Sequence, residues 1–259
     1  MRELELIGRI AIMIPFLRSH YSKELLSEKI GSIVTIAGWI EDIRPLGSLA
    51  FMTIRDKTGV SQVVFNKKNI SSEIFGLAIN VPRQSIVSIR GVLKEGKGKD
   101  IPKEIQGEKM QILGEAIHPL VLDPTGRVKA AIDTRLNARA LDLRNVKTMS
   151  IFKIKHTTLQ SIRGTLSDEG YLEVNTAKII GQAAEGGANL FPFDYFDKDA
   201  FLAQSPQLFK EQLTMSLDRV FEIGSYYRAE KSHTRRHLNE FISVDIEAAF
   251  AEKDDVMET

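Results

Sequence analysis

The sequence predicts two domains, a β-rich N-terminal domain built as a small barrel or sandwich and an α+β C-terminal domain. From Gly31 to about Gly114, short runs rich in β-branched and aromatic residues alternate with turn signals. A stretch with proline breaks and mixed charge follows, and from Thr148 the apolar residues recur at helical spacing. At 259 residues the chain is long enough for two hydrophobic cores.

The first domain is predicted from the strand-like runs "SIVTIAGWIEDI", "LAFMTIRD", "VSQVVFN" and "QSIVSIRGVLKE". Strands at this spacing are typical of small barrels, and an oligonucleotide-binding (OB) barrel is among the options. We place this domain at residues 18–114, after an N-terminal extension at 1–17. The extension contains "LIGRIAIMIPFL", which Arg9 interrupts and which is too short to span a bilayer, so we expect no membrane association.

The second domain, residues 148–259, follows a predicted linker at 115–147. The run "MSIFKIKHTTLQSIRGTLSDEGY" predicts a helix that ends at Gly170, and "YLEVNTAKII" reads as a strand. After the glycine-rich turn "QAAEGGANLF", the run "FLAQSPQLFKEQL" places Pro206 at a helix start.

A β-hairpin is predicted near the end of the chain. "RVFEIGSYYRAE" and "ISVDIEAAF" have strand patterns, and the cation-rich loop "KSHTRR" joins them. In the second strand, Ile242 and Val244 alternate with polar residues. We therefore expect Arg228, Glu230 and Asp245 on one hairpin.

Composition narrows the function classes. Apolar residues make up 43% and charged residues 27% of the chain, which is ordinary for a soluble globular protein. The formal net charge is +1, so nucleic-acid binding would have to come from local patches. The absence of cysteine excludes disulfides and Cys-ligated zinc and favours a reducing compartment, the cytoplasm.

Each polar cluster of the second domain has an ordinary structural explanation when taken singly. A glutamate before two glycines is usually a turn, S-P-Q-L is usually a helix cap, and an arginine two residues from a glutamate often pairs with it on one strand face. Together, acidic, amide and cationic groups at separate strand ends, flanked by apolar runs, indicate a polar pocket on an antiparallel sheet. The residues alone leave the ligand open.

Several motifs in the right order resemble one family. "FEIGSYYRAEKSHTRRHLNEFISVDIEAAF" resembles the second signature motif of class II aminoacyl-tRNA synthetases, in their aspartate/asparagine subgroup. "EGGANLFPFDYFDKDAFLAQSPQLFKEQL" is similar to the amino-acid-binding segment of aspartyl-tRNA synthetases of the archaeal and eukaryotic type. The first domain resembles their anticodon-binding OB fold, and "DPTGRVKAAIDTRLNARALDLRN" resembles their hinge.

The resemblance implies an N-terminal OB-fold β-barrel and an α+β class II synthetase domain with an antiparallel sheet and flanking helices. It implies aspartate activation by ATP and transfer to the 3′ end of tRNA. Arg228 would bridge the α-phosphate and the amino-acid carboxylate, where charge builds during attack. The full set of residues that the resemblance assigns to ATP and catalysis is Arg228, Glu230, Arg236, His237, Leu238 and Phe241.

The resemblance also assigns the other substrates. Phe51 would stack on an anticodon base, with Arg44 and Gln62 beside it; without the resemblance Phe51 reads as a core residue. A lysine at position 210 suits a substrate carboxylate better than an amide. The residues assigned to the amino acid are Glu185, Ser205, Gln207, Lys210 and Asp245.

The sequence also departs from the family pattern. It ends at Thr259, before the third motif and the magnesium ligands, so we expect a C-terminally incomplete catalytic domain with no metal site of its own. Ala177 stands where the family has a proline at the dimer interface. Expected partners are tRNA(Asp), aspartate and a second subunit. Alternatives are an asparaginyl enzyme or one that also charges tRNA(Asn), and a non-catalytic tRNA-binding protein.

Overall fold

The computed structural model describes residues 18–98, 101–182, 190–231, 234 and 237–258. The predicted extension at 1–17 lies outside the described residues. The chain divides into two compact units, with the division after Asn145. Each unit is described by itself.

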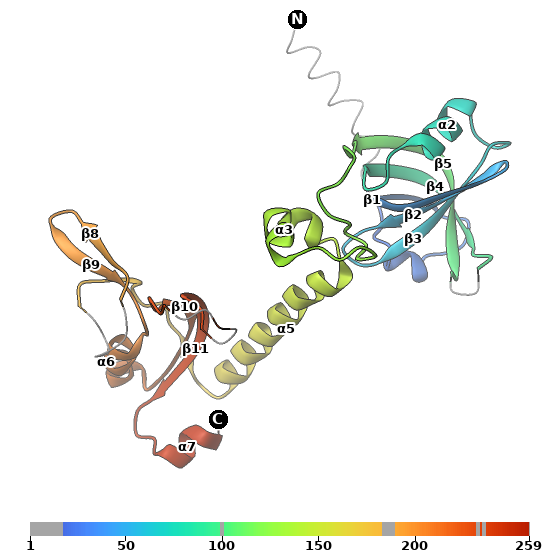
Figure 1. Cartoon of the computed structure of the whole chain (residues 1–259). Coiled ribbons are helices and arrows are strands. Elements are labelled where there is room, and N and C mark those ends of the chain that lie inside the picture. The colour runs from blue at the N-terminus through green and yellow to red at the C-terminus, as the bar shows by residue number, and fades with distance from the viewer. Residues whose placement is uncertain (1–17, 99–100, 183–189, 232–233, 235–236, 259) are drawn as a thin grey trace, which may run out of the picture. The chain divides into compact units, whose positions relative to one another are not determined.

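The first unit is a closed five-stranded barrel with strand order β1-β2-β3-β5-β4 (Figure 1). Its β3–β5 contact is parallel, and the other strand pairs are antiparallel. Because the sheet closes on itself, the first domain is a barrel and not a sandwich. The strands are β1 Ile33–Leu46, β2 Leu49–Arg55, β3 Val60–Asn66, β4 Ile86–Glu95 and β5 Lys103–Gly114, with helix α2 at Ser72–Asn80 between β3 and β4.

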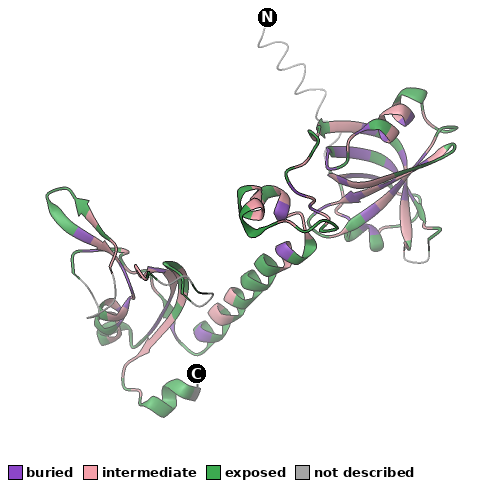
Figure 2. Ribbon diagram, in the orientation of Figure 1, coloured by how far each residue is buried: buried purple, intermediate pink, exposed green. Residues whose placement is uncertain are grey.

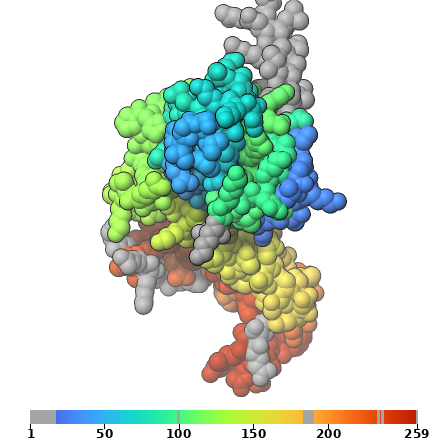
Figure 3. Space-filling model, turned by 90° about the vertical axis from the view of Figure 1, so that its right-hand side faces the viewer, coloured from blue at the N-terminus to red at the C-terminus, as the bar shows by residue number. Residues whose placement is uncertain are grey.

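Alternating burial along the strands fills the barrel with apolar side chains, which Figure 2 shows as buried stripes on the ribbon. Phe65, fully buried on β3, illustrates the packing: a Cβ at Gly107 would come within 2.5 Å of its ring, so β5 needs a glycine there. Helix α2 starts at the cap Ser71, whose hydroxyl accepts the Ile74 amide at 3.3 Å. Figure 3 looks onto the tip of the β1–β2 hairpin, with α2 in teal above it.

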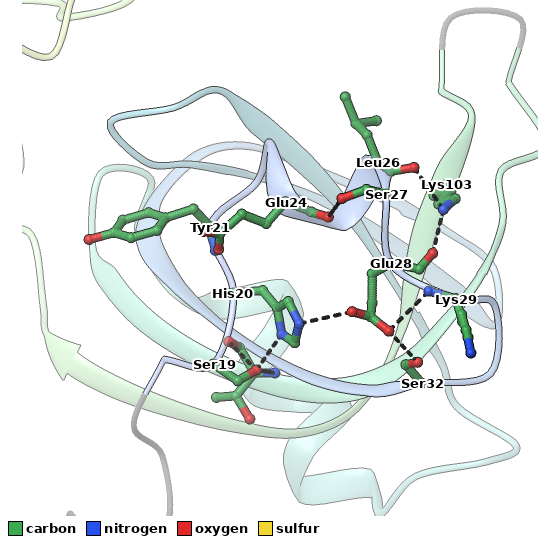
Figure 4. Close-up of polar contacts among 11 residues, drawn as sticks. Ser19, His20, Tyr21, Glu24, Leu26, Ser27, Glu28, Lys29, Ser32 and Lys103 are labelled. Carbon is green, nitrogen blue, oxygen red and sulfur yellow. Dashed lines mark hydrogen bonds and ion pairs between the residues drawn. The ribbon is translucent and has the colours of Figure 1, made fainter.

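The segment before β1 is fastened to the barrel by charged side chains (Figure 4). The ammonium of Lys103 on β5 donates to the carbonyl of Leu26, the last residue of a short 3₁₀ helix (η2, Glu24–Leu26), and to the carbonyl of Glu28. The carboxylate of Glu28 accepts the Ser32 hydroxyl at 2.7 Å and lies 3.3 Å from the His20 ring. The Ser32 hydroxyl and the Lys29 amide lower the pKa of Glu28.

The segment interpreted as a linker packs on the barrel as far as residue 145. The guanidinium of Arg144 lies 5.3 Å from the centre of the Trp39 ring and donates to the Gln84 backbone carbonyl at 3.2 Å. Two short helices, α3 Ile132–Asn137 and α4 Arg139–Asp142, lie in this segment. The predicted domain limits at 114 and 147 stay a prediction, while the second compact unit starts with Val146.

The second unit contains two three-stranded sheets and three helices among its described residues (Figure 1). In the first sheet, order β11-β10-β6, β10 pairs antiparallel with β11 and parallel with β6; the second sheet, order β7-β9-β8, is antiparallel. This agrees with the α+β class that the sequence predicts. The elements are α5 Val146–Asp168, β6 Leu172–Glu173, β7 Ile179–Ile180, β8 Pro192–Tyr195, β9 Lys198–Leu202, α6 Gln207–Leu217, β10 Arg219–Tyr227, β11 Glu240–Ala248 and α7 Lys253–Glu258.

The predicted helix end is confirmed, because α5 stops at Asp168 and Gly170 has a φ of +86°, a left-handed conformation that glycine adopts without strain. Most of α5 is exposed (Figure 2). Near its C-terminal end, Leu166 packs in a small core with Tyr171 and Phe221.

The prediction of one strand over "YLEVNTAKII" is wrong, because only the two-residue strands β6 and β7 form there. Between them, the Thr176 backbone amide donates to the Glu222 carboxylate at 3.1 Å and its hydroxyl does so at 2.7 Å. These side-chain contacts replace the ladder hydrogen bonds of a continuous strand.

Candidate functional site

The β10–β11 hairpin carries the central part of the site, as the sequence predicts. Its register pairs Tyr226 with Phe241 and Glu222 with Asp245. Paired residues lie on the same sheet face, so these four side chains share one face. Ile242 and Val244 of β11 lie on the opposite face and are 46% and 42% exposed.

A hollow of ≈ 440 Å³ lies at the open end of this hairpin. Its lining consists of five residues that the sequence assigns to ATP and catalysis: Arg228, Glu230, His237, Leu238 and Phe241. The sixth, Arg236, lies outside the described residues. The structure thus brings the described members of this set together, and their roles stay a prediction.

Backbone and ring contacts hold Arg228, the cationic residue in the lining of this hollow, in position. The Arg228 amide donates to the Asn239 carbonyl at 3.0 Å, which holds the two strand ends together just beyond the ladder. The Arg228 guanidinium carbon lies 5.5 Å from the centre of the Phe241 ring. Its Nε atom is buried and has no hydrogen-bond partner. Arg228 is therefore positioned by its neighbours while retaining donor capacity.

Two side chains in the lining of the hollow, His237 and Glu230, approach each other. His237 Nε2 lies 3.8 Å from the Glu230 carboxylate, and His237 Nδ1 lies 2.6 Å from the Thr234 hydroxyl. The side chains of His237 and Glu230 are 48% and 33% exposed, so solvent screens their attraction. Both groups remain accessible to a ligand in the hollow.

A buried lysine contacts the polar face of β11. Lys210 on α6 has a side chain only 5% exposed, with Nζ 3.5 Å from Asp245 and 3.4 Å from Glu247. Nζ also donates to the Ile246 carbonyl at 3.2 Å. The second oxygen of Asp245, Oδ2, is buried without a partner. The predicted neighbours Lys210 and Asp245 are thus together, at distances longer than a close ion pair.

The other residues assigned to the amino acid are not all brought to this cluster. Gln207 is the first residue of α6; its amide nitrogen donates to Glu211 at 2.8 Å along the exposed helix surface. The Ser205 hydroxyl accepts the Gln207 backbone amide at 3.4 Å. Pro206 occupies the N-cap position of α6, as a helix start there predicts. Glu185 lies outside the described residues.

Sequence reasoning missed two acidic residues of the site. Glu247 could have been found, because it lies two residues after Asp245 and so on the same strand face. Glu222, 1% exposed, faces Asp245 across the strands and binds the Lys178 ammonium at 2.6 Å. Burial opposes its ionisation, but the Lys178 ammonium and the Thr176 hydroxyl outweigh burial and lower the pKa of Glu222.

Tyr226 contacts the Lys178 ammonium, which binds Glu222, and also the core beside Phe241 in the hollow. Its hydroxyl accepts from Lys178 Nζ at 2.9 Å, and the same ammonium lies 4.1 Å from the centre of its ring. Burial and the Glu222 carboxylate raise the pKa of Tyr226, so its phenol stays neutral. Tyr226 is fully buried and belongs to the core that Phe241 packs against.

The barrel carries the second predicted surface. Arg44 on β1 pairs with Phe51 on β2, and Phe51 pairs with Val64 on β3. Gln62 lies on β3 two residues before Val64, and its amide donates to Glu104 at 2.9 Å. Phe51 is half-buried and borders a hollow of ≈ 510 Å³. The lining, which includes charged residues that the sequence did not single out, is Ile30, Leu49, Phe51, Val64, Asn66, Lys94, Glu95, Lys97, Glu104 and Gln106.

Matches to known protein families identify the class of this protein. Residues 131–259 match the family of class II tRNA synthetases for D, K and N, and residues 34–113 match the OB-fold nucleic acid binding domain. The chain belongs to the class II tRNA synthetases of this group, with an anticodon-binding OB fold before the catalytic domain. The expected family and fold class are confirmed.

Curated relatives of this chain include aspartate–tRNA ligases. The chain is 49% identical to the aspartate–tRNA(Asp/Asn) ligase of Methanococcoides burtonii, over 93% of this chain and 55% of the relative. It is 45% identical to the aspartate–tRNA(Asp) ligase of Pyrococcus horikoshii, over 92% of this chain and 55% of the relative. The chain therefore spans about half the length of the curated relatives it matches.

Solved structures show the same architecture. The asparaginyl-tRNA synthetase of Pyrococcus horikoshii, complexed with asparaginyl-adenylate, matches with a TM-score of 0.86 at 34% identity, covering 92% of this chain and 55% of that one. The aspartyl-tRNA synthetase of Entamoeba histolytica matches with a TM-score of 0.77 at 27% identity, covering 93% and 53% of the two chains.

No helix among the described residues is long and apolar enough to cross a membrane.

Proposed function

We propose that this chain provides the anticodon-binding domain and part of the catalytic domain of an aspartate–tRNA ligase. The reaction is activation of aspartate by ATP to aspartyl-adenylate, followed by transfer to the 3′ end of tRNA(Asp). One observation carries the proposal: the β10–β11 hairpin carries both the hollow lined by Arg228 and Phe241 and the carboxylate of Asp245, which Lys210 approaches from α6.

The chemistry requires a fixed cation where charge builds. Attack of the aspartate carboxylate on the α-phosphorus of ATP brings two anions together, and diphosphate leaves with the electron pair of the broken P–O bond. A preorganised guanidinium stabilises this transition state without a cost of reorganisation. Arg228, with a buried Nε that has no protein partner, suits that role. Phe241 offers its ring to the adenine, and His237 and Arg236 are proposed to bind the outer phosphates.

The amino acid is proposed to bind between α6 and β11. Asp245 receives the α-ammonium with Glu185, because a buried cation needs anionic partners. Lys210, only 5% exposed, receives the side-chain carboxylate with Gln207, and Ser205 orients the substrate. A neutral amide would not balance the Lys210 charge, which favours aspartate over asparagine.

A second candidate for the tRNA that this chain serves is tRNA(Asn). One relative at 49% identity is named as a ligase for both tRNA(Asp) and tRNA(Asn), which favours a chain that also serves tRNA(Asn). In either case the anticodon is proposed to bind the barrel at Phe51, with Arg44 and Gln62 beside it. We extend the proposal to a homodimer in the cytoplasm, the site of tRNA charging.

Magnesium accompanies ATP in this proposal. No group of three or more His, Cys, Asp or Glu side chains suited to a metal occurs in the described parts of the chain. None of these residues is therefore assigned as a magnesium ligand. When bound, the ion neutralises phosphate charge.

The test is ATP–pyrophosphate exchange by the 259-residue chain, with aspartate and asparagine supplied separately. Exchange with aspartate alone supports the ligase. Exchange with neither amino acid, together with tight tRNA binding, contradicts catalysis by this chain and favours the non-catalytic tRNA-binding alternative.

A further inference from the structure

Buried polar atoms without partners are concentrated in the candidate site. In the described part of residues 146–259, they belong to only three residues: Gln204 (Nε2 and Oε1), Arg228 (Nε) and Asp245 (Oδ2). Leaving a buried polar group unpaired costs about 1–3 kcal/mol, and such groups in a native protein call for an explanation. Arg228 and Asp245 already have one, since both are proposed to bind substrate.

Gln204 is the residue for which neither the sequence nor the family motif supplied a role. It is 1% exposed, and both atoms of its amide lack a partner. A buried amide that served only the fold would be expected to form hydrogen bonds within the protein. Gln204 therefore shares with Arg228 and Asp245 a buried polar side-chain atom that the protein leaves without a partner.

Backbone hydrogen bonds place Gln204 beside the hairpin. The Ala203 carbonyl accepts the Tyr227 amide at 2.9 Å, and the Ala203 amide donates to the Lys178 carbonyl at 3.0 Å. Gln204 and Arg228 each follow directly after one end of the Ala203–Tyr227 bond. On its other side, Gln204 leads into α6, which carries Lys210. Gln204 thus lies between the elements that hold the two substrate-binding clusters.

The chemistry of the amide favours a ligand group that both donates and accepts hydrogen bonds. Gln204 needs an acceptor for Nε2 and a donor for Oε1 at the same time. A phosphate only accepts hydrogen bonds, so it would leave Oε1 unpaired. The α-ammonium and α-carboxylate of an amino acid supply a donor and an acceptor on two groups bonded to the same carbon.

We propose that Gln204 is an amino-acid-binding residue that contacts both α-groups of the substrate, together with Asp245 at the ammonium and Arg228 at the carboxylate. This inference rests on the proposed function. The neutral Gln204 amide would bind the α-ammonium and α-carboxylate, which all amino acids share. It would therefore contribute affinity and orientation without distinguishing aspartate from asparagine.

The test replaces Gln204 with methionine, which has a similar length and no amide. Aspartate and ATP binding to the full chain are measured separately by calorimetry, and unfolding is measured by thermal denaturation. We expect aspartate to bind about tenfold more weakly and ATP binding to be unchanged. The melting temperature should be equal or higher, because the unpaired amide is removed. Gln111→Met is the matched control, since Gln111 also has a buried, unpaired Oε1 but lies in the barrel.

The outcomes separate the two proposals. A lower melting temperature with equal losses for both ligands, or unchanged aspartate binding, overturns the role of Gln204. A wild-type chain that binds neither aspartate nor ATP contradicts the proposed function first, and the role of Gln204 fails with it.

Discussion

The guanidinium of Arg228 lies over the ring of Phe241, with 5.5 Å between the guanidinium carbon and the ring centre. Arg228 follows the end of β10, and Phe241 lies near the start of β11, where it pairs with Tyr226. Two of the six residues that the family motif assigns to ATP and catalysis are therefore in contact with each other.

Arg228→Lys should lower ATP–pyrophosphate exchange on the order of 100-fold, because an ammonium cannot reproduce the planar donor fork. Folding should be unchanged. Arg219→Lys is the matched control, since Arg219 lies at the other end of β10 with its guanidinium 5.6 Å from the Tyr171 ring. Equal exchange rates for both variants would remove Arg228 from the catalytic role.

Lys210→Met should weaken aspartate activation about 10- to 100-fold, the loss expected for a hydrogen bond to a charged group. Asparagine activation, where present, should fall less, because the lysine does not match a neutral amide. Steady-state exchange at varied amino-acid concentration measures both. Lys198→Met, at an exposed position on β9, serves as the control. A parallel loss for both amino acids would argue that Lys210 only supports the fold.

Lys178→Met should destabilise the second unit by about 3–5 kcal/mol, because it leaves the buried Glu222 carboxylate without a counter-ion. Urea denaturation followed by circular dichroism measures this loss. The double variant Lys178→Met/Glu222→Gln should recover much of it, since no buried charge remains. Failure of the second substitution to restore stability would show that the Lys178–Glu222 pair is not the cause.

Acid should weaken the second unit through Glu222. Its pKa is lowered from the ordinary 4.5, so the folded state holds fewer protons than the unfolded state in that range. The stabilisation is complete above pH 4.5 and is lost as the pH falls through the lower, folded-state pKa. Denaturation midpoints measured from pH 7 down to pH 3 should show this loss in the wild type. In Glu222→Gln the loss should be smaller, and an identical pH dependence would contradict the assignment.

Phe51→Ala should weaken tRNA binding about 10- to 100-fold, because base stacking on an aromatic ring contributes about 1–3 kcal/mol. Filter binding at fixed salt concentration measures the affinity. Val60→Ala, on the neighbouring strand β3 and 50% exposed, controls for general effects on the barrel. If both variants bind tRNA equally, the anticodon contacts another face.

The sequence by itself determined the order and kind of the main elements. Strand alternation identified the first four barrel strands, and helical spacing with Gly170 fixed the end of α5, because these signals are local along the chain. The family motif likewise pointed to Arg228, Glu230, His237 and Phe241, which line one hollow. The sequence could not show that "YLEVNTAKII" breaks into two short strands, because the carboxylate that binds Thr176 comes from β10, far along the chain.

Only the tertiary structure decided which side chains meet. Closure of the barrel depends on the parallel contact between β3 and β5, which no local pattern encodes. Burial of Glu222 against Lys178, and of Gln204 without a partner, follows from long-range packing of β7, β9 and β10. Whether a polar side chain is solvated or buried depends on all the elements around it, and this environment determines its pKa and its capacity to bind a ligand.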